Sequence, residues 1–307
     1  MHINDIFTQR KTTVSFEFFP PKTDKGASAL FEEISQLAPL KPSFVSATYG
    51  AGGGTRELTR ELVIRIKNET PIEVIPHLTC VTHTEAEIYD ILETYAQAGI
   101  SNILALGGDV PQSLGAYDRS KDAFRFASQL VRYIRQFKDR HGGEPIGDNR
   151  GFGIGVAGFP EGHPGTPNRL EEIDHLKAKV DEGADFIITQ LFFDNRDFVD
   201  FCERCELAGI KVPIIAGIMP ITSINGMRKM AELAAGARIP ARLLRAVERC
   251  QGDAEAVTRV GVHWATEQCR DLLDQGVRGI HLYTLNKSSA TRDIYSMLGI
   301  KDSLVVA

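Results

Sequence analysis

The sequence predicts an α/β protein that folds as a closed (β/α)8 TIM barrel, in a single domain over residues 1–307. Eight short apolar runs are typical of buried strands, and amphipathic helices are expected between them. The first four runs begin about thirty residues apart, which is the length of one βα unit. A chain of 307 residues, 43% of them hydrophobic, can fill one core of this size.

The predicted strands occupy residues 14–19, 44–49, 74–80, 103–109, 154–159, 186–193, 214–219 and 280–285. Among the helices between them, one is marked by Ile88 and Leu92 at helical spacing, and Gly99 ends it. Later helices are expected to end in the same way at Gly183, Gly209 and Gly276. Two intervals are longer, because a loop over residues 110–120 follows the fourth strand and an extra helical segment over residues 240–250 precedes the eighth.

The first strand, TVSFEFFPP at residues 13–21, carries one carboxylate in an apolar run and stops at two prolines. Because side chains alternate along a strand, Glu17 shares a face with Ser15, while Phe16 and Phe18 point to the other side. Burial raises the pKa of a carboxyl group, so Glu17 is a candidate proton donor near neutral pH. A structural glutamate paired with a neighbouring strand explains the same residues equally well.

The chemistry of such a barrel is expected at the carboxyl ends of its strands. The residues predicted there are Glu17, Thr48, Tyr49, His77, Thr79, Gly108, Asp109, His163, Gln190, Tyr283, Asn286 and Lys287. A helix over residues 168–183 begins near the same end, with Asn168 as its expected N-cap. It places Glu172, His175 and Lys179 on one stripe, although a polar stripe is usually a solvated face.

An open, doubly wound sheet is the competing architecture, and it would need a dinucleotide-binding loop. Gly153, Gly155 and Gly158 spell GxGxxG, but they lie inside a predicted strand and a proline-rich segment follows. The GAGGGT segment at residues 50–55 lies before a helix but lacks the third glycine. Neither segment is expected to bind a dinucleotide in this way.

Cys202 and Cys205 form a CxxC pair late in a predicted helix, on the same stripe as Phe198 and Phe201. A redox-active pair would lie at a helix N-terminus, and a zinc site would need a second pair of ligands. Both cysteines are therefore expected in the core. Five cysteines, an odd and sparse set, are typical of reduced thiols in a cytosolic protein.

The net charge of −5 comes without a basic cluster, which argues against partners such as nucleic acid or a membrane surface. The N-terminal residues do not resemble a signal peptide, and no apolar run is long enough to span a bilayer. A cytoplasmic protein is expected.

Eight segments, in order from the first strand to the eighth, together resemble the 5,10-methylenetetrahydrofolate reductase family. They are SFEFFPPKT (15–23), SATYGAGG (46–53), PHLTC (76–80), GGDVP (107–111), GFPEGHP (158–164), ITQLFFD (188–194), GIMPI (217–221) and HLYTLNK (281–287). The resemblance is to the short bacterial form, which consists of the catalytic barrel only.

The resemblance implies FAD as cofactor and ping-pong reduction of 5,10-methylenetetrahydrofolate to 5-methyltetrahydrofolate by NAD(P)H, in one-carbon metabolism and methionine biosynthesis. It implies that Glu17 is the general acid and that Asp109 is the aspartate beside the flavin. The residues matching FAD contacts are Thr48, His77, Gly107, Gly108, Asp109, Phe126, Ala127, Phe159, His163, Glu172, His175 and Lys179. Those matching substrate contacts are Glu17, Gln190, Met230, Tyr283 and Lys287. A homo-oligomer is a further expectation.

Five positions depart from the family pattern. Gly107 replaces an arginine, Phe126 and Phe159 replace tyrosines, Met230 replaces a stacking aromatic residue, and Lys287 replaces an arginine. These changes affect the expected FAD and folate contacts but not Glu17 or Asp109. They leave two other readings open: a flavin-binding barrel subunit without folate reductase activity of its own, and a pterin-binding methyltransferase barrel without flavin.

Overall fold

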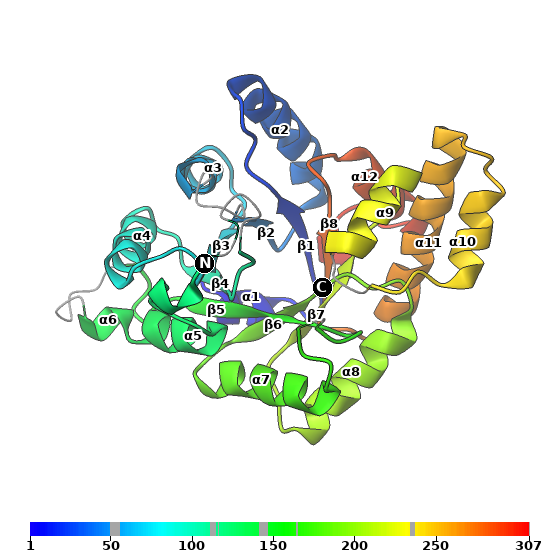
Figure 1. Ribbon diagram of the computed structural model, residues 1–307. Helices are drawn as coiled ribbons and strands as arrows, with labels where there is room; N and C mark the ends of the chain where they lie inside the picture. Colours follow the sequence, from blue (N-terminus) through cyan, green and yellow to red (C-terminus); the bar gives the residue numbers. More distant parts are fainter. Residues whose placement is uncertain are drawn as a thin grey trace.

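The computed structural model describes residues 1–49, 56–110, 115, 117–140, 147–163, 165–233 and 237–306. Within these ranges, eight parallel strands pair in sequence order and β8 pairs with β1, so the sheet is a closed barrel (Figure 1). The strands are β1 (Thr13–Phe18), β2 (Phe44–Ala47), β3 (Val74–Thr79), β4 (Asn102–Leu106), β5 (Gly153–Gly158), β6 (Phe186–Thr189), β7 (Ile214–Ile218) and β8 (Gly279–Tyr283). The predicted fold class is confirmed.

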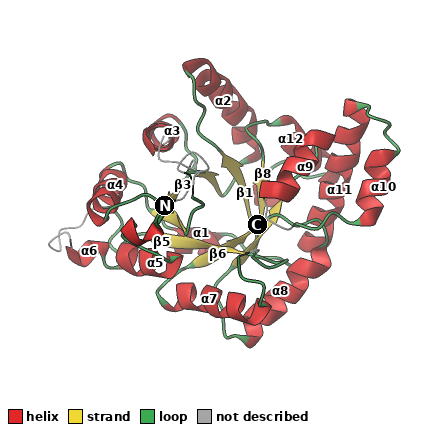
Figure 2. Ribbon diagram, in the orientation of Figure 1, coloured by secondary structure: helices red, strands yellow, loops and turns green. Residues whose placement is uncertain are grey.

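Helices surround the barrel on its outside, and the first helix packs against the amino ends of the strands (Figure 2). They are α1 (Ile3–Gln9), α2 (Asp24–Leu37), α3 (Arg56–Glu69), α4 (Glu85–Gln97), α5 (Ala127–Arg135), α6 (Phe137–Arg140), α7 (Arg169–Asp181), α8 (Asn195–Leu207), α9 (Ile224–Leu233), α10 (Ala241–Glu248), α11 (Ala254–Asp274) and α12 (Ser289–Leu298). Short 3₁₀ turns span Ala38–Leu40, Arg119–Lys121 and Ser303–Val305. The extra helix expected over residues 240–250 is α10.

Several strands end before the predicted residue, and the difference is largest at β6 and β4. β6 ends at Thr189, and the apolar residues Leu191 and Phe193 leave the sheet to pack in a second hydrophobic cluster. β4 ends at Leu106, so Gly107 and Asp109 lie in the loop that follows it. The prediction was wrong at the end of β6 because a continuous apolar run does not show where a strand leaves the sheet. It was wrong at the end of β4 because Gly107, Gly108 and Asp109 are residue types that strands disfavour.

The faces of β1 follow the predicted alternation. Val14, Phe16 and Phe18 are buried between the barrel and the surrounding helices, and the ring of Phe16 lies edge-on to that of Tyr295 in α12. Burying aromatic rings of this size stabilises the fold by roughly 1.5 to 3 kcal/mol each. The other face of β1 therefore points into the barrel, and Glu17 is on it.

Helix α1, which the sequence analysis did not predict, packs against the amino ends of the strands. Ile3 and Ile6 are buried in a cluster with side chains of the barrel interior such as Phe44 and Phe186. The side chain of Asn102, at the start of β4, accepts a hydrogen bond from the Ile3 amide and donates one to the Met1 carbonyl. This end of the barrel is filled by apolar side chains, so the site is sought at the other end.

Local sequence signals explain how α4 begins and ends. Thr84 caps the helix and forms a reciprocal capping box with Glu87. Gly99, with φ of 73°, provides the left-handed turn that leads into β4. Asn168 caps α7 as expected, because its side chain accepts a hydrogen bond from the Leu170 amide.

The expectations for the CxxC pair and the GxGxxG segment are confirmed. Cys205 is buried and Cys202 half-buried in α8, and burial raises the pKa of each thiol to about 12. Gly155 lies inside β5, where an added Cβ would overlap the ring of Phe186. The glycine is needed for packing against β6, not for a phosphate-binding turn.

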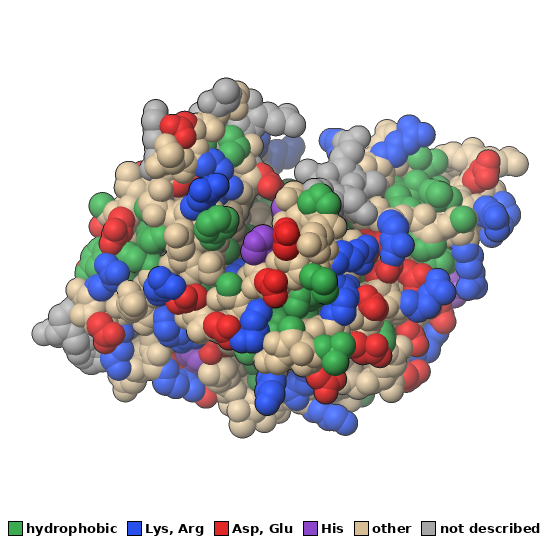
Figure 3. Space-filling model, turned by 60° about the horizontal axis from the view of Figure 1, so that its bottom comes forward, with side chains coloured by type: hydrophobic (Ala, Val, Ile, Leu, Met, Phe, Trp, Pro, Cys, Tyr) green, Lys and Arg blue, Asp and Glu red, His purple; other side chains and the backbone are tan. Residues whose placement is uncertain are grey.

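The described side chains of either charge alternate over the face shown in Figure 3, in agreement with the absence of a basic cluster in the sequence. No described helix is long and apolar enough to cross a membrane. The same residues contain no group of three or more His, Cys, Asp or Glu placed to hold a metal ion. The GAGGGT segment at residues 50–55, Pro111 and Pro164 lie outside the described residues.

Candidate functional site

Glu17 lies inside the barrel near the carboxyl end of β1, surrounded by polar side chains of three other strands. Its Oε2 atom accepts a hydrogen bond from the Ser46 hydroxyl of β2 at 3.4 Å. The same oxygen is 3.4 Å from His77 Nε2 of β3 and 3.6 Å from His281 Nε2 of β8. The side chain of Glu17 is 18% exposed, so one side of the carboxyl group still reaches the mouth of the barrel.

His281 connects this carboxyl group to the layer below it. It is fully buried, its Nδ1 is 2.7 Å from the Ser15 hydroxyl, and its Nε2 is 3.3 Å from the Ser46 hydroxyl. Its ring stacks over Phe44 and meets the ring of Tyr283 edge-on at 5.2 Å. These contacts fix the orientation of the imidazole beside Glu17.

The protonation expected for Glu17 is corrected by these neighbours. Burial acts to raise the Glu17 pKa, but the contact with His281, the positive charge that His77 or His281 carries when it is protonated, and the Ser46 hydroxyl lower it more, so the net direction is downward. Burial lowers the pKa of His77 to about 4, which keeps that ring neutral at pH 7. In this structure Glu17 is therefore a carboxylate, and the expectation of a raised pKa is wrong.

The loop after β8 holds the end of β1 in place. The Thr284 hydroxyl donates to the Glu17 carbonyl at 2.6 Å. The Asn286 side chain accepts from the Phe19 amide at 2.9 Å and donates to the Phe19 carbonyl at 2.8 Å. Asn286 itself has φ of 59°, a left-handed conformation that asparagine tolerates well. The backbone is thus held at Glu17 itself and two residues after it.

The segment after β4 presents backbone rather than side chains. No described atom lies within 4 Å of an added Cβ at Gly107, so that position faces open space. Gly108 has φ of 76°, and an added Cβ there would lie 2.8 Å from that of Thr79. Only glycine fits at residue 108. Asp109 follows as an exposed carboxylate.

Arg119 is a residue that the sequence analysis missed. It donates to the Gly107 carbonyl at 3.3 Å, and its Nε is 3.3 Å from the carboxylate of Asp122. Its guanidinium therefore lies beside the position where the family pattern has an arginine. Nothing in the spacing of the sequence indicates that this loop returns to the end of β4.

The loop after β5 and helix α7 bring the next group of predicted residues together. His163 lies edge-on to the Phe159 ring at 4.7 Å. Burial lowers the His163 pKa. The negative charge of Asp109 acts to raise this pKa and the positive charge of Lys179 lowers it further, so both charges are near enough to act on the ring. His175 of α7, which lies on one stripe with Glu172 and Lys179, is exposed.

Glu172 and Lys179 face the protein and not the solvent. Lys179 donates to the Ala157 carbonyl of β5 at 2.6 Å, and burial lowers its pKa to about 8. Glu172 is buried, burial raises its pKa, and its Oε2 has no hydrogen-bond donor among the described residues. A buried acceptor without a donor indicates a place where a ligand hydroxyl would be favourable.

The β6, β7 and β8 ends pack tightly around Tyr283. Its hydroxyl donates to the Thr189 carbonyl at 2.8 Å, across β7, and an added Cβ at Gly217 would overlap that carbonyl oxygen. Gln190 follows at the end of β6, where its backbone N–H donates to the Gly158 carbonyl at 2.7 Å. The Tyr283 hydroxyl is therefore already bonded, which leaves its ring as the surface for a ligand.

The remaining predicted residues are not among the hydrogen-bond and ion-pair partners of the Glu17 side chain within the part of the chain that the structure describes. The Thr48 amide donates to the Phe18 carbonyl, which places Thr48 beside the end of β1. Phe126 is exposed, and Ala127 begins α5. Met230 is buried in the second hydrophobic cluster, and Lys287 is exposed on the loop after β8. The ligand contacts expected for these residues stay predictions.

Comparison with known proteins gives a consistent result. The family model for methylenetetrahydrofolate reductase matches residues 2–299. Methylenetetrahydrofolate reductase (NADH) 1 of Arabidopsis thaliana is 40% identical over 98% of this chain, but the chain spans only 50% of that relative. The 5,10-methylenetetrahydrofolate reductase of Escherichia coli is 37% identical over 96% of this chain and 94% of the relative. The chain thus spans about half the length of the plant relatives and nearly all of the bacterial one.

Solved structures share the barrel. A Clostridium thermocellum protein described as binding two copies of 5-methyl-5,6,7,8-tetrahydrofolic acid superposes with a TM-score of 0.63 at 15% identity, over 98% of this chain and 99% of the other. A 2,3-dimethylmalate lyase superposes with a TM-score of 0.51 at 15% identity, over 97% of this chain and 85% of the other. At such low identity these likenesses show the fold alone.

Proposed function

The chain belongs to the methylenetetrahydrofolate reductase family, and from this premise we propose that it reduces 5,10-methylenetetrahydrofolate to 5-methyltetrahydrofolate with NAD(P)H and bound FAD. The observation that carries the proposal is the position of Glu17. A carboxyl group held inside the barrel at the strand ends, in contact with His77, His281 and Ser46, has the surroundings of a proton-transfer residue.

The strand ends suit an aromatic, hydroxyl-rich and anionic cofactor such as FAD. No described atom lies within 4 Å of an added Cβ at Gly107, so the backbone there is open to a flat ring. Helix α7, which follows β5, carries the cation of Lys179 and the acceptor oxygen of Glu172 that is unpaired among the described residues. When bound, FAD would relay a hydride between the nicotinamide and the folate. We propose FAD and not the smaller FMN because the expected cofactor contacts extend from the end of β4 to α7.

Glu17 is assigned the protonation that opens the five-membered ring of the folate. The exposed side of its carboxyl group faces the mouth, where a bound pterin would cover it and exclude water. Such covering adds to the burial effect that raises the Glu17 pKa, and so favours uptake of the proton that the carboxylate lacks in this structure.

Asp109 and Gln190 are assigned electrostatic and binding roles. The exposed carboxylate of Asp109, at the β4 end, would stabilise positive charge that develops on the opened folate. The Gln190 side chain, at the β6 end, carries both a donor and an acceptor for the edge of the pterin. Cytoplasmic location and a homo-oligomeric state are proposed on sequence grounds alone.

The absorption spectrum of the purified protein tests the proposal. We expect a flavin spectrum, FAD on heat release, loss of colour with NADH or NADPH under anaerobic conditions, and return of colour with 5,10-methylenetetrahydrofolate. Bleaching without return of colour would support a flavin-binding subunit without folate reductase activity. A protein that binds no flavin even after reconstitution would contradict the proposal and favour the methyltransferase alternative.

A further inference from the structure

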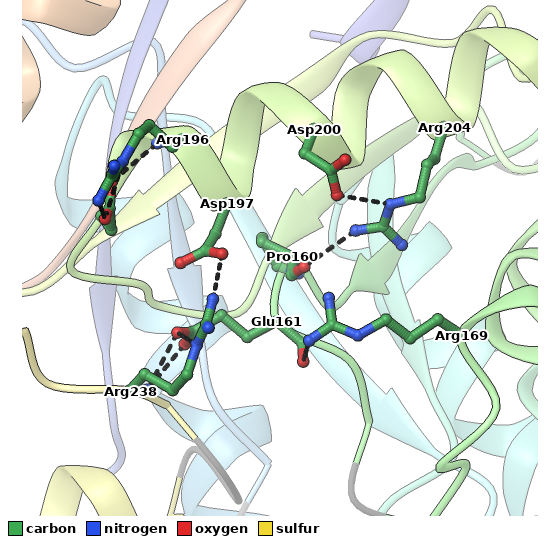
Figure 4. Close-up of polar contacts among 9 residues, drawn as sticks. Pro160, Glu161, Arg169, Arg196, Asp197, Asp200, Arg204 and Arg238 are labelled. Atoms are coloured by element: carbon green, nitrogen blue, oxygen red, sulfur yellow. Dashed lines mark hydrogen bonds and ion pairs between the residues drawn. The ribbon is translucent and has the colours of Figure 1, made fainter.

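A cluster of ionic and polar contacts outside the Glu17 region fixes two residues of the loop after β5 (Figure 4). The Pro160 carbonyl accepts a hydrogen bond from Arg204 of α8 at 3.1 Å, and the Glu161 carbonyl accepts one from Arg169 of α7 at 2.9 Å. Arg204 is in turn paired with Asp200 at 2.8 Å. The main chain of this loop is therefore held by two helices.

The Glu161 side chain reaches a third element. Its two carboxylate oxygens accept from the Arg238 amide at 3.0 and 3.1 Å, and one of them also accepts from Arg238 Nε at 3.2 Å. Arg238 lies between α9 and α10, and the other end of its guanidinium pairs with Asp197 of α8. Glu161 thus joins segments 77 residues apart in the sequence.

The two arms of this cluster differ in burial. The Glu161 side chain is 6% exposed, whereas that of Arg238 is 64% exposed. An exposed ion pair such as Arg238–Asp197 contributes little, because water and salt screen it. The contact of a buried carboxylate with a backbone N–H is different, since removing the carboxylate leaves a donor without its partner.

The segments joined by Glu161 lead to different parts of the site. On one side, Glu161 is two residues before His163, whose ring packs edge-on against Phe159, and both are expected FAD contacts. On the other side, Ala237 adjoins Arg238 and packs in the hydrophobic cluster that contains Met230 and contacts Tyr283. The residues expected to meet the cofactor and those expected to meet the folate are therefore connected through one carboxylate.

We propose that Glu161 and Arg238 form a clamp that positions the loop after β5 against the α9–α10 connection, and so sets the spacing between the cofactor and the folate. Glu161 is the positioning residue of this clamp. The inference rests on the proposed function and adds to it two residues that are not among the expected FAD and folate contacts. The clamp is expected to affect the binding of both FAD and folate, because the loop after β5 and the α9–α10 connection depend on the same contact.

Variants of the clamp separate positioning from simple stability. Glu161→Ala removes the acceptor, and Glu161→Gln retains one acceptor oxygen for the Arg238 amide. Arg196→Ala is the matched control, since Arg196 of α8 is 90% exposed and pairs with Asp194 at the start of its own helix. The thermal midpoint of each variant is measured first. FAD dissociation, the KM for the folate and kcat are then measured at a temperature well below that midpoint.

We expect Glu161→Ala to weaken FAD binding and to raise the folate KM together, each by about tenfold, the effect of losing one buried charge-assisted hydrogen bond. Glu161→Gln should recover part of both losses, and Arg196→Ala should change neither. A lower thermal midpoint with unchanged FAD affinity and folate KM would show a merely structural contact. Loss confined to one ligand would also overturn the proposed clamp.

Hydrogen exchange tests the clamp without any ligand or activity. In Glu161→Ala, the Arg238 amide should exchange faster together with residues 161–163, while α4 should keep its protection. Unchanged exchange at Arg238 would overturn the clamp even in a fully active enzyme. If the wild-type protein binds no flavin while Glu161→Ala shows the expected faster exchange, the proposed function is overturned and the contact itself stands.

Discussion

Glu17 shows how two neighbours can reverse the effect of burial on a single residue. Desolvation alone would keep its carboxyl group protonated, but His281 and Ser46 favour the charged form. Alternation along the strand predicted that Glu17 shares a face with Ser15, and the structure shows that this face points into the barrel. It could not predict the partners, because His77 and His281 come from strands 60 and 264 residues away in the chain and their register is not written in local periodicity.

Glu17→Gln is predicted to lower the rate of folate reduction by roughly 10² to 10⁴, the usual contribution of a positioned general acid. The amide preserves the shape of the side chain but has no transferable proton. FAD binding and oxidation of NADH should be retained. Stopped-flow absorbance of the flavin with each substrate in turn measures the two reactions separately.

A structural role for Glu17 predicts another pattern. Breaking a buried ion pair costs about 3 to 5 kcal/mol and would lower the thermal midpoint together with both reactions. A stable Glu17→Gln protein that reduced the folate at the wild-type rate would end the assignment of Glu17 as the acid.

His77 predicts a loss of stability in mild acid. Its pKa is about 4 in the folded protein and 6.5 in its ordinary state, so the unfolded chain binds the proton more readily between these values. Stability should therefore fall as the pH drops from 6.5 towards 4, by on the order of 3 kcal/mol from this residue. Glu17 acts in the same direction at lower pH, because its lowered pKa makes its contribution disappear as the carboxylate is protonated.

Urea unfolding at a series of pH values measures this dependence, with His77→Asn as the comparison. The variant should lose less stability than the wild type between pH 6.5 and 4. Parallel curves for the two proteins would show that His77 does not carry the effect.

Among the elements, β7 depends on a glycine because of its neighbours. Thr189 of β6 and Tyr283 of β8 are hydrogen-bonded across Gly217, which leaves no room for a Cβ. The prediction is that Gly217→Ala forces β7 outward and destabilises the protein by roughly 1 to 3 kcal/mol or more, as overpacking does. Gly107→Ala is the control, since no described atom lies near its added Cβ. Equal chemical-denaturation midpoints for the two variants would refute this packing account.

The strands and helices were predictable where one face of an element is apolar and its ends carry punctuating residues. The capped helix α4 and the glycine-terminated helices are of this kind. Helix α1 escaped prediction because it has seven residues and too few apolar positions to show a period. The end of β6 was placed too late because Leu191 and Phe193 are apolar for a different reason, their packing in the second cluster.

For the molecule as a whole, the order of the elements determined where the site had to be. Apolar side chains and α1 fill the amino end of the barrel, while the predicted polar residues collect at the carboxyl ends of the strands. The barrel therefore brings together Glu17 and His77, although the two residues are far apart in sequence. The position of Arg119 beside Gly107 could not be predicted, since it depends on the path of an irregular loop.

The central claim is that this barrel converts 5,10-methylenetetrahydrofolate to 5-methyltetrahydrofolate through its bound flavin. A single-turnover experiment tests it most directly: the FAD-loaded protein is reduced anaerobically with NADH, freed of excess nucleotide, and mixed with 5,10-methylenetetrahydrofolate. The account predicts 5-methyltetrahydrofolate, identified by mass, in an amount equal to the flavin that is reoxidised. Reduced flavin that persists in the presence of the folate, with no 5-methyltetrahydrofolate formed, would contradict it.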